Sequence, residues 1–231
     1  MRNFFVIIIV VFFGYVMYGI FENFDGTTEL SDVSKFYAAP DNVEKVNAQN
    51  IVTAVVVTYR GLDTLGEVTV LFLAAAIIAF FLKKQSETRT LRANSEIFKT
   101  AATVLYPVIL VAGVYIFMNG HLTPGGGFQG GAVMASAVIV MMLAFPNKPV
   151  SKSVLGYIES TSGVVYVLLA AFGAILGAGF LDNAILPLGE FGKLFSAGAI
   201  PVIYSFVGLK VGAELSNIIT KYKYVQEDVQ Q

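Results

Sequence analysis

The sequence places a few ionisable side chains inside long apolar runs, where charge is costly and is a functional hypothesis by default. Lys210 and Glu214 are four residues apart, so they share one face of a helix. Lys210 lies about nine residues before the end of its apolar run, which is near mid-membrane at the helical rise. The pair therefore fits a proton or ion path and, equally, a neutral pair that holds helices together.

A second candidate pair combines Glu67 with Arg60, seven residues earlier and about two turns away if one helix contains both. A carboxylate beside an arginine on a broken helix could bind or relay a cation. The alternative is an ion pair that anchors the chain at the membrane interface, and the residue pattern by itself favours this anchor.

A glycine-rich stretch, residues 120–131, separates two apolar runs and contains the single histidine of the chain, His121. Pro124 and the glycines after it cannot continue a helix. One helix should therefore end near Asn119 and another should begin near Phe128. At membrane depth, such exposed backbone is tolerated only inside protein or beside a water-filled cavity.

Two side chains of this stretch could act on ions. His121 could relay a proton, because histidine titrates near neutral pH; a solvated loop histidine is the commoner alternative. Phe128 would occupy the first turn of the next helix, whose amino end carries partial positive charge. There it could gate a water path, although packing is the commoner role of an aromatic residue.

The composition is that of a membrane protein. The chain has 231 residues, 56% apolar and 13% charged, whereas soluble domains carry about twice that charge. It has no cysteine and one histidine, which excludes disulfides, thiolate-ligated clusters and a multi-histidine metal site. Neither a phosphate-binding loop nor a basic nucleic-acid patch occurs. We expect no cofactor, no permanent metal and no enzyme activity of the chain alone.

The apolar runs predict an all-α polytopic protein, because several approach the roughly 18 residues that span a bilayer. A further apolar segment, 48–58, is too short to cross and is interpreted as re-entrant or as the outer half of a broken helix. Glycine pairs at 173/177 and 208/212 indicate close helix packing without naming the partner. The six expected crossings are 4–21, 65–82, 97–119, 128–145, 153–180 and 194–219.

Charge asymmetry predicts the topology. The first run is interpreted as an uncleaved transmembrane helix rather than a signal peptide, and the acidic segment 22–45 as an extramembrane loop. The basic linker 83–99 and the lysines after the fourth and sixth crossings fall on one side. Both termini are therefore expected in the cytoplasm, and a module boundary is expected near residue 92.

The stretch His121-Leu-Thr-Pro-Gly-Gly-Gly-Phe-Gln-Gly-Gly131 resembles the signature of the B subunit (MnhB or MrpB) of multisubunit Mrp-type sodium/proton antiporters. It is also similar to the F subunit of archaeal membrane-bound hydrogenases. The resemblance covers about residues 95–220, including the expected number of four helices. It implies that residues 93–231 form one four-helix membrane module.

The front of the chain resembles a second part of the same systems. Residues 50–67, from Asn50-Ile-Val-Thr to Gly-Glu67, are similar to the carboxy-terminal segment of the large antiporter A subunit. In membrane-bound hydrogenases this segment is a separate E subunit. Leu62 stands where relatives usually have Phe, and Thr58 where they often have an acid. Residues 1–92 would then be an E-type module fused to the B-type module.

The resemblance implies a multi-pass subunit of a complex that translocates sodium and protons in the cell membrane, related to respiratory complex I. Its partners would be other membrane subunits, lipid, sodium and protons, with no nucleic acid. Because the long antiporter-like part is missing, a membrane-bound hydrogenase or sulfur reductase is favoured over a plain Mrp antiporter. Motif matches carry ion translocation onto Arg60, Glu67, His121, Pro124 and Phe128, with transient sodium at Glu67; Lys210 and Glu214 are added from their position alone.

Two alternatives remain open at this stage. A scaffold subunit without an ion path would use the same helices only to seal a larger pump. Six crossings and a broken helix also permit a self-sufficient secondary transporter, but the two halves of the chain show no internal repeat, which argues against it.

Overall fold

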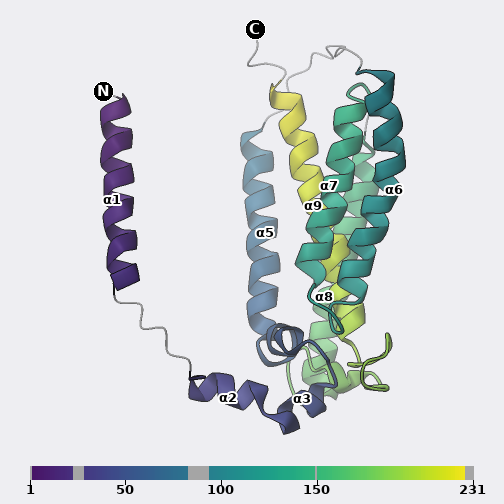
Figure 1. Ribbon diagram of the computed structural model, residues 1–231. Helices are drawn as coiled ribbons and strands as arrows, with labels where there is room; N and C mark the ends of the chain where they lie inside the picture. The colour runs from purple at the N-terminus through teal and green to yellow at the C-terminus, as the bar shows by residue number, and fades with distance from the viewer. Residues whose placement is uncertain (1, 23–28, 83–93, 149, 227–231) are drawn as a thin grey trace. The chain divides into compact units, whose positions relative to one another are not determined.

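The computed structural model describes residues 2–22, 29–82, 94–148 and 150–226, and all regular elements in these ranges are helical (Figure 1). Six of the described helices are long and apolar enough to cross a membrane. The prediction of an all-α polytopic protein is therefore confirmed. The chain divides into two compact units, Met1–Phe36 and Tyr37–Gln231.

The first unit consists mainly of α1, Arg2–Glu22. Its membrane-length window, Phe4–Glu22, has a mean hydropathy of 2.6 and no buried residue. A helix that is apolar on every side suits a lipid or helix-packed environment. Two short helices follow in the acidic segment, α2 (Asp32–Ala38) and, in the second unit, α3 (Pro40–Val46).

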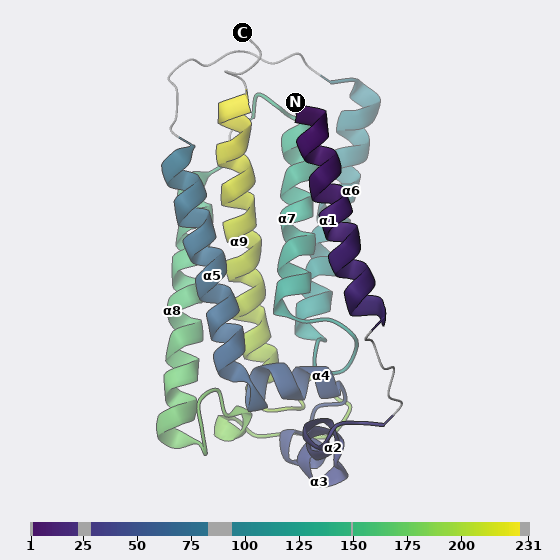
Figure 2. The same cartoon turned by 90° about the vertical axis from the view of Figure 1, so that its left-hand side faces the viewer.

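The second unit is a bundle of five long helices, each running opposite to the one before it (Figures 1 and 2). The helix α9 packs against the other four, and 56% of its membrane-length window is buried inside the chain. It is therefore the central helix of the bundle. The five helices are α5 (Gly61–Phe81), α6 (Glu96–Met118), α7 (Gly127–Ala144), α8 (Lys152–Leu176) and α9 (Ile200–Gln226).

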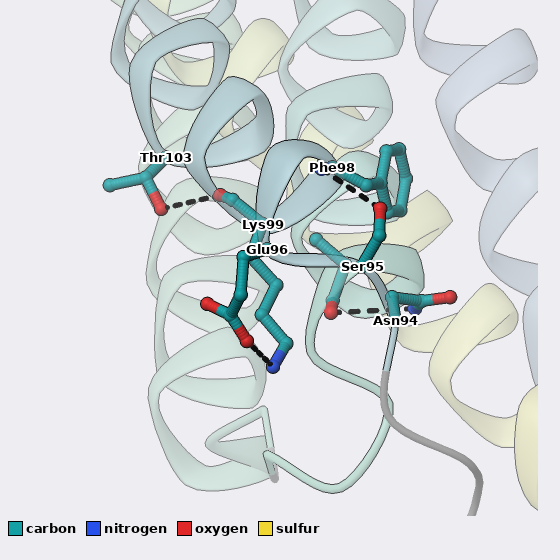
Figure 3. A network of polar contacts seen from close by, with 7 residues as sticks. Asn94, Ser95, Glu96, Phe98, Lys99 and Thr103 are labelled. Carbon is teal, nitrogen blue, oxygen red and sulfur yellow. Dashed lines mark hydrogen bonds and ion pairs between the residues drawn. The ribbon is translucent and has the colours of Figure 1, made fainter.

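The two ends of this bundle differ. The loop end holds the segment 50–60, the glycine loop (residues 119–126) and the loop 177–199. At the linker end, α5, α7 and α9 finish and α6 and α8 begin. There the Asn94 side chain donates to the carbonyl oxygens of Leu143 (2.5 Å) and Ala144 (3.4 Å), and the hydroxyl of Ser95 caps α6 (Figure 3). These bonds tie the start of α6 to the end of α7.

The short apolar segment 48–58 is a broken helix. The helix α4, Ile51–Thr53, continues into a π-helical turn, Ala54–Tyr59, and the chain then bends at Arg60 into α5. Nine residues are too few to cross a bilayer, and α4 runs across the loop end of the bundle (Figure 2). Single π-turns recur at functional sites.

The last two crossings are shorter at the loop end than the apolar pattern predicts. The helix α8 ends at Leu176 rather than near 180, and α9 begins at Ile200 rather than 194. The intervening loop contains a 3₁₀ turn, Asn183–Ile185, and left-handed residues, including Ala197 (φ 61°) and Gly198 (φ 59°). These backbone conformations stop the helix although the residues are apolar. The predicted module boundary near residue 92 lies outside the described residues, and the cytoplasmic location of the termini stays a prediction.

Glycines set the distance between α7 and its two neighbours. A Cβ on Gly130 would lie 2.6 Å from the carbonyl oxygen of Gly113 in α6, and one on Gly131 would lie 2.7 Å from that of Gly208 in α9. Gly208 and Gly212 thus form a helix contact, as their spacing indicates. Gly173 and Gly177 do not, because they face the backbone and side chain of the loop that follows their own helix, around Asp182.

We predict that Gly131→Val separates α7 from α9. The added atoms meet the backbone of α9, which cannot rotate away. Overpacking typically lowers the free energy of unfolding by about 1–3 kcal/mol, and we expect a loss of at least this size. Thermal unfolding of the purified complex measures this loss. Gly156→Ala is the matched control, because nothing lies within 4 Å of a Cβ at Gly156. Equal stability of the two variants would contradict the packing role of Gly131.

Candidate ion-translocation residues

The glycine loop is fastened by the segment that precedes the broken helix. The Asn50 side-chain amide donates to the carbonyl oxygens of Gly120 (2.9 Å) and Thr123 (3.0 Å), and its backbone N–H donates to that of His121 (2.9 Å). The hydroxyl of Thr53 donates to the Gly120 oxygen at 2.6 Å. These carbonyl oxygens therefore accept hydrogen bonds from protein donors, which is one of the two environments that the sequence allows for exposed backbone at membrane depth.

Tyr204 of α9 completes this junction. Its hydroxyl donates to the Thr53 hydroxyl at 3.2 Å. Its ring would lie 2.7 Å from a Cβ at Gly120 and 3.2 Å from one at Gly126. The two glycines are thus required because the tyrosine ring approaches the loop backbone closely. The junction joins α4, the glycine loop and α9, which are far apart in the sequence.

His121 is fully buried, so it is not a solvated loop residue. Its Nε2 lies 3.4 Å from the carbonyl oxygen of Lys193, and its Nδ1 has no hydrogen-bond partner among the described residues. Burial lowers the pKa of His121, against the nearby backbone carbonyl groups of Lys193, Leu194 and Met118, which raise it. The imidazole is therefore neutral at pH 7.

The other two motif residues of the glycine loop differ in burial. Pro124 is exposed at the loop end. Phe128, in the first turn of α7, is partly buried and packs against the apolar core. This contact is the packing role that sequence reasoning considered commoner for Phe128, and a gating role stays a prediction.

Glu67 lies in the second turn of α5 and is exposed on the surface of the chain. Arg60 forms an ion pair with Asp63. Among the described residues, the predicted pair of Arg60 and Glu67 is therefore not observed. The bend at Arg60 explains this, since the two residues do not share one continuous helix. The Glu67 carboxylate is close enough to the hydroxyls of Tyr166 and Tyr204 to interact electrostatically.

Lys210 and Glu214 form the predicted pair on one face of α9. The Lys210 Nζ lies 3.1 Å from Glu214 Oε2, and both side chains are buried. The Nζ also lies 5.1 Å from the centre of the Phe72 ring of α5, a cation–π distance. The lysine stem packs against α8 at Gly163, where a Cβ would lie in ordinary van der Waals contact, 3.5 Å from Lys210 Cδ.

The structure also contains polar residues that sequence reasoning missed or gave a minor role. Tyr166 of α8 is fully buried, and its hydroxyl has no partner among the described residues. Glu159 of α8 accepts a hydrogen bond from Asn217 of α9 at 2.6 Å. A tyrosine or asparagine in an apolar run carries no periodic signal, so only the helix packing shows these contacts.

Comparison with known proteins identifies the chain. A family model described as a domain related to the MnhB subunit of Na⁺/H⁺ antiporters matches residues 97–217, more than half of the chain. The chain belongs to this family. A second model, MbhE, which describes the E subunit of MBH, matches residues 1–97. The protein is therefore a fusion of an MbhE-like part and an MnhB-like part, as the sequence motifs indicate.

Named relatives agree with this assignment. An uncharacterized protein of Methanocaldococcus jannaschii is 34% identical over 72% of this chain and 74% of its own length. The B subunit of the Na⁺/H⁺ antiporter of Bacillus subtilis is 33% identical over 40% of this chain. The alignment spans 66% of that antiporter subunit, so it leaves a third of it unmatched.

Two solved membrane complexes contain chains of similar structure. A chain of the membrane-bound sulfane sulfur reductase, an archaeal respiratory membrane complex, is 38% identical with a TM-score of 0.82, covering 96% of this chain and 97% of that one. A chain of the Mrp complex from Dietzia sp. shares the fold alone, with a TM-score of 0.71 at 24% identity, over 95% of this chain and 26% of that one. The protein is a multi-pass cell-membrane subunit of an Mrp-type antiporter module.

We predict that Thr53→Val weakens the junction between α4, the glycine loop and α9. Valine removes the acceptor of the buried Tyr204 hydroxyl and one donor to Gly120, so the free energy of unfolding should fall by about 1–3 kcal/mol. Thermal unfolding of the purified complex measures the change. Thr123→Val is the matched control, since its hydroxyl bonds only within the glycine loop, to Asn119. A similar loss in both variants would count against the junction.

The lowered pKa of His121 predicts a pH-dependent loop end. Above about pH 6.5, His121 is neutral in folded and unfolded states alike and adds no pH dependence. Below it, the unfolded state binds the proton first, so stability is lost as the pH falls towards the lower pKa of the folded state. The protection factors of the amides in residues 119–126, which correct for the slower intrinsic exchange in acid, should therefore fall as the pH is lowered. The neutral variant His121→Gln should lack this extra acid sensitivity. An identical pH response of the variant and the wild type would refute the assignment of this acid sensitivity to His121.

Proposed function

We propose that this chain carries part of the sodium and proton route of its complex, in addition to packing against other subunits. The observation that supports this most is the buried Lys210–Glu214 pair, 3.1 Å apart, in the central helix α9. Ionisable residues at membrane depth are expensive and commonly mark ion or proton paths. A pair needed only for packing could be replaced by apolar side chains without loss.

Glu67 supplies the second part of the proposal. It lies in the second turn of a membrane-length helix, α5, and is exposed on this chain. Because a carboxylate facing lipid is unfavourable, Glu67 faces a neighbouring membrane subunit in the assembled complex. There it exchanges sodium or a proton transiently, within electrostatic reach of the hydroxyls of the buried Tyr166 and Tyr204. The fastened glycine loop holds these elements in place.

For the parent complex we favour a membrane-bound respiratory complex over a plain Mrp antiporter. The similarity to the sulfane sulfur reductase chain runs over nearly the whole of both chains at 38% identity. The matching part of the Dietzia Mrp complex is 26% of a much longer chain. The redox reaction then belongs to other subunits, and this chain acts on ions without enzyme chemistry of its own.

A scaffold role is the second candidate. The tight glycine contacts of α7 and the hydrogen bonds that occupy the loop carbonyl oxygens favour it. The two functions differ in what happens when a charge is removed without disturbing assembly.

We predict that Glu67→Gln assembles but loses sodium-dependent transport at least about tenfold, since glutamine keeps the shape and removes the ionisable group. Sodium movement in vesicles that hold the whole complex measures this. Glu190→Gln, an exposed loop acid at the same end of the bundle, should transport normally. Unchanged transport in Glu67→Gln, with normal assembly, would favour the scaffold.

A further inference from the structure

The two carboxylate oxygens of Glu214 have different surroundings. Oε2 accepts a hydrogen bond from Lys210 at 3.1 Å. Oε1 is buried and has no partner among the residues that the structure describes. A buried acceptor without a partner is unfavourable, because it has lost its hydrogen bonds to water. A proton on Oε1, or a water that donates to it, would remove this cost.

A second carboxylate lies on the neighbouring helix. Glu159 of α8 is half-buried and accepts a hydrogen bond from Asn217 at 2.6 Å. Asn217 follows Glu214 by three residues, so the two lie on the same side of α9. Glu159 is also close enough to Glu214 to interact with it electrostatically. It lies about 10 Å along α8 from the linker end, at the rise of a helix.

The charges of this cluster are not balanced. Lys210 contributes one positive charge, while Glu214 and Glu159 contribute two negative charges when both are ionised. Both Lys210 and Glu159 are close enough to Glu214 to act on its charge, and α5 contributes the Phe72 ring to the same cluster. One excess negative charge within the bundle is costly, and binding one proton neutralises it.

The chemistry of the cluster selects a proton over a sodium ion. The Lys210 ammonium, 3.1 Å from Oε2, repels a metal cation at the same carboxylate. A hard cation needs several oxygen ligands at once, and the described residues supply few here.

We propose that Glu159 is the group through which protons from the linker end reach Glu214. A carboxyl proton leaves Glu159 and, through a bridging water, forms an O–H bond at Glu214 Oε1, which leaves a carboxylate on Glu159. Asn217 is the positioning residue that holds Glu159 in place. This proposal rests on the proposed function of the Lys210–Glu214 pair, and it assigns the proton to a particular atom and entry route.

The test uses the whole complex in vesicles and the pH profile of proton-coupled sodium transport. Glu159→Gln should lower the transport rate by about tenfold or more, because a general acid–base group typically contributes 10²–10⁴-fold. Glu159→Asp should restore most of it. Asn217→Ala, which keeps the Glu159 carboxylate but removes the hydrogen bond that positions it, should shift the pH profile. Glu96→Gln is the matched control, an exposed acid paired with Lys99 at the same end of the bundle (Figure 3).

The outcomes separate this proposal from the proposed function. If Glu214→Gln loses transport while Glu159→Gln behaves like Glu96→Gln, the entry route is wrong and the function stands. If Glu214→Gln and Glu67→Gln both transport normally, the proposed function fails and the proposal fails with it. A raised sodium KM in Glu159→Gln with an unchanged pH profile would also overturn proton transfer. Should Glu159→Gln not assemble, an unchanged pH profile in Asn217→Ala overturns the proposal.

Discussion

Backbone carbonyl oxygens at the end of an apolar bundle must find donors, and this requirement organises the loop end of the protein. The glycine loop lies between α6 and α7, so the carbonyl oxygens of Gly120, His121 and Thr123 have no acceptor role in a helical hydrogen bond. Asn50 and Thr53 supply the donors. An unpaired group in such surroundings would cost several kcal/mol. The junction therefore binds the MbhE-like part to the MnhB-like part within one bundle.

The same constraint explains why α9 is the central helix. The helix α9 holds Tyr204 near the loop end and the Lys210–Glu214 pair near its middle. The Tyr204 hydroxyl finds its hydrogen-bond partner in α4, and the two charged side chains pair with each other on one face of α9. Close glycine contacts with α6 and α7 bring the helix backbones near enough to exclude lipid. Polar groups in α9 are thereby kept inside protein, where an ion route can exist without exposing charge to the bilayer.

The fusion also has a physical consequence for assembly. Hydrogen bonds from Asn47 to Leu188 and Gly189, and from Asn183 to Val46, cross between the two parts and add to the Asn50 junction. A separate front subunit would have to form these contacts between two chains and lose translational freedom on binding. In one chain they form within a single molecule, at fixed stoichiometry.

The sequence by itself determined the membrane class, the number of long helices, the break at Pro124 and the shared face of Lys210 and Glu214. These follow from composition, helical periodicity and proline chemistry, which act locally along the chain. Only the tertiary structure decided that Arg60 pairs with Asp63, that His121 is buried, and that Glu159 meets Asn217. Such contacts depend on which helices are neighbours and how they are rotated, and a single sequence carries no local signal for either.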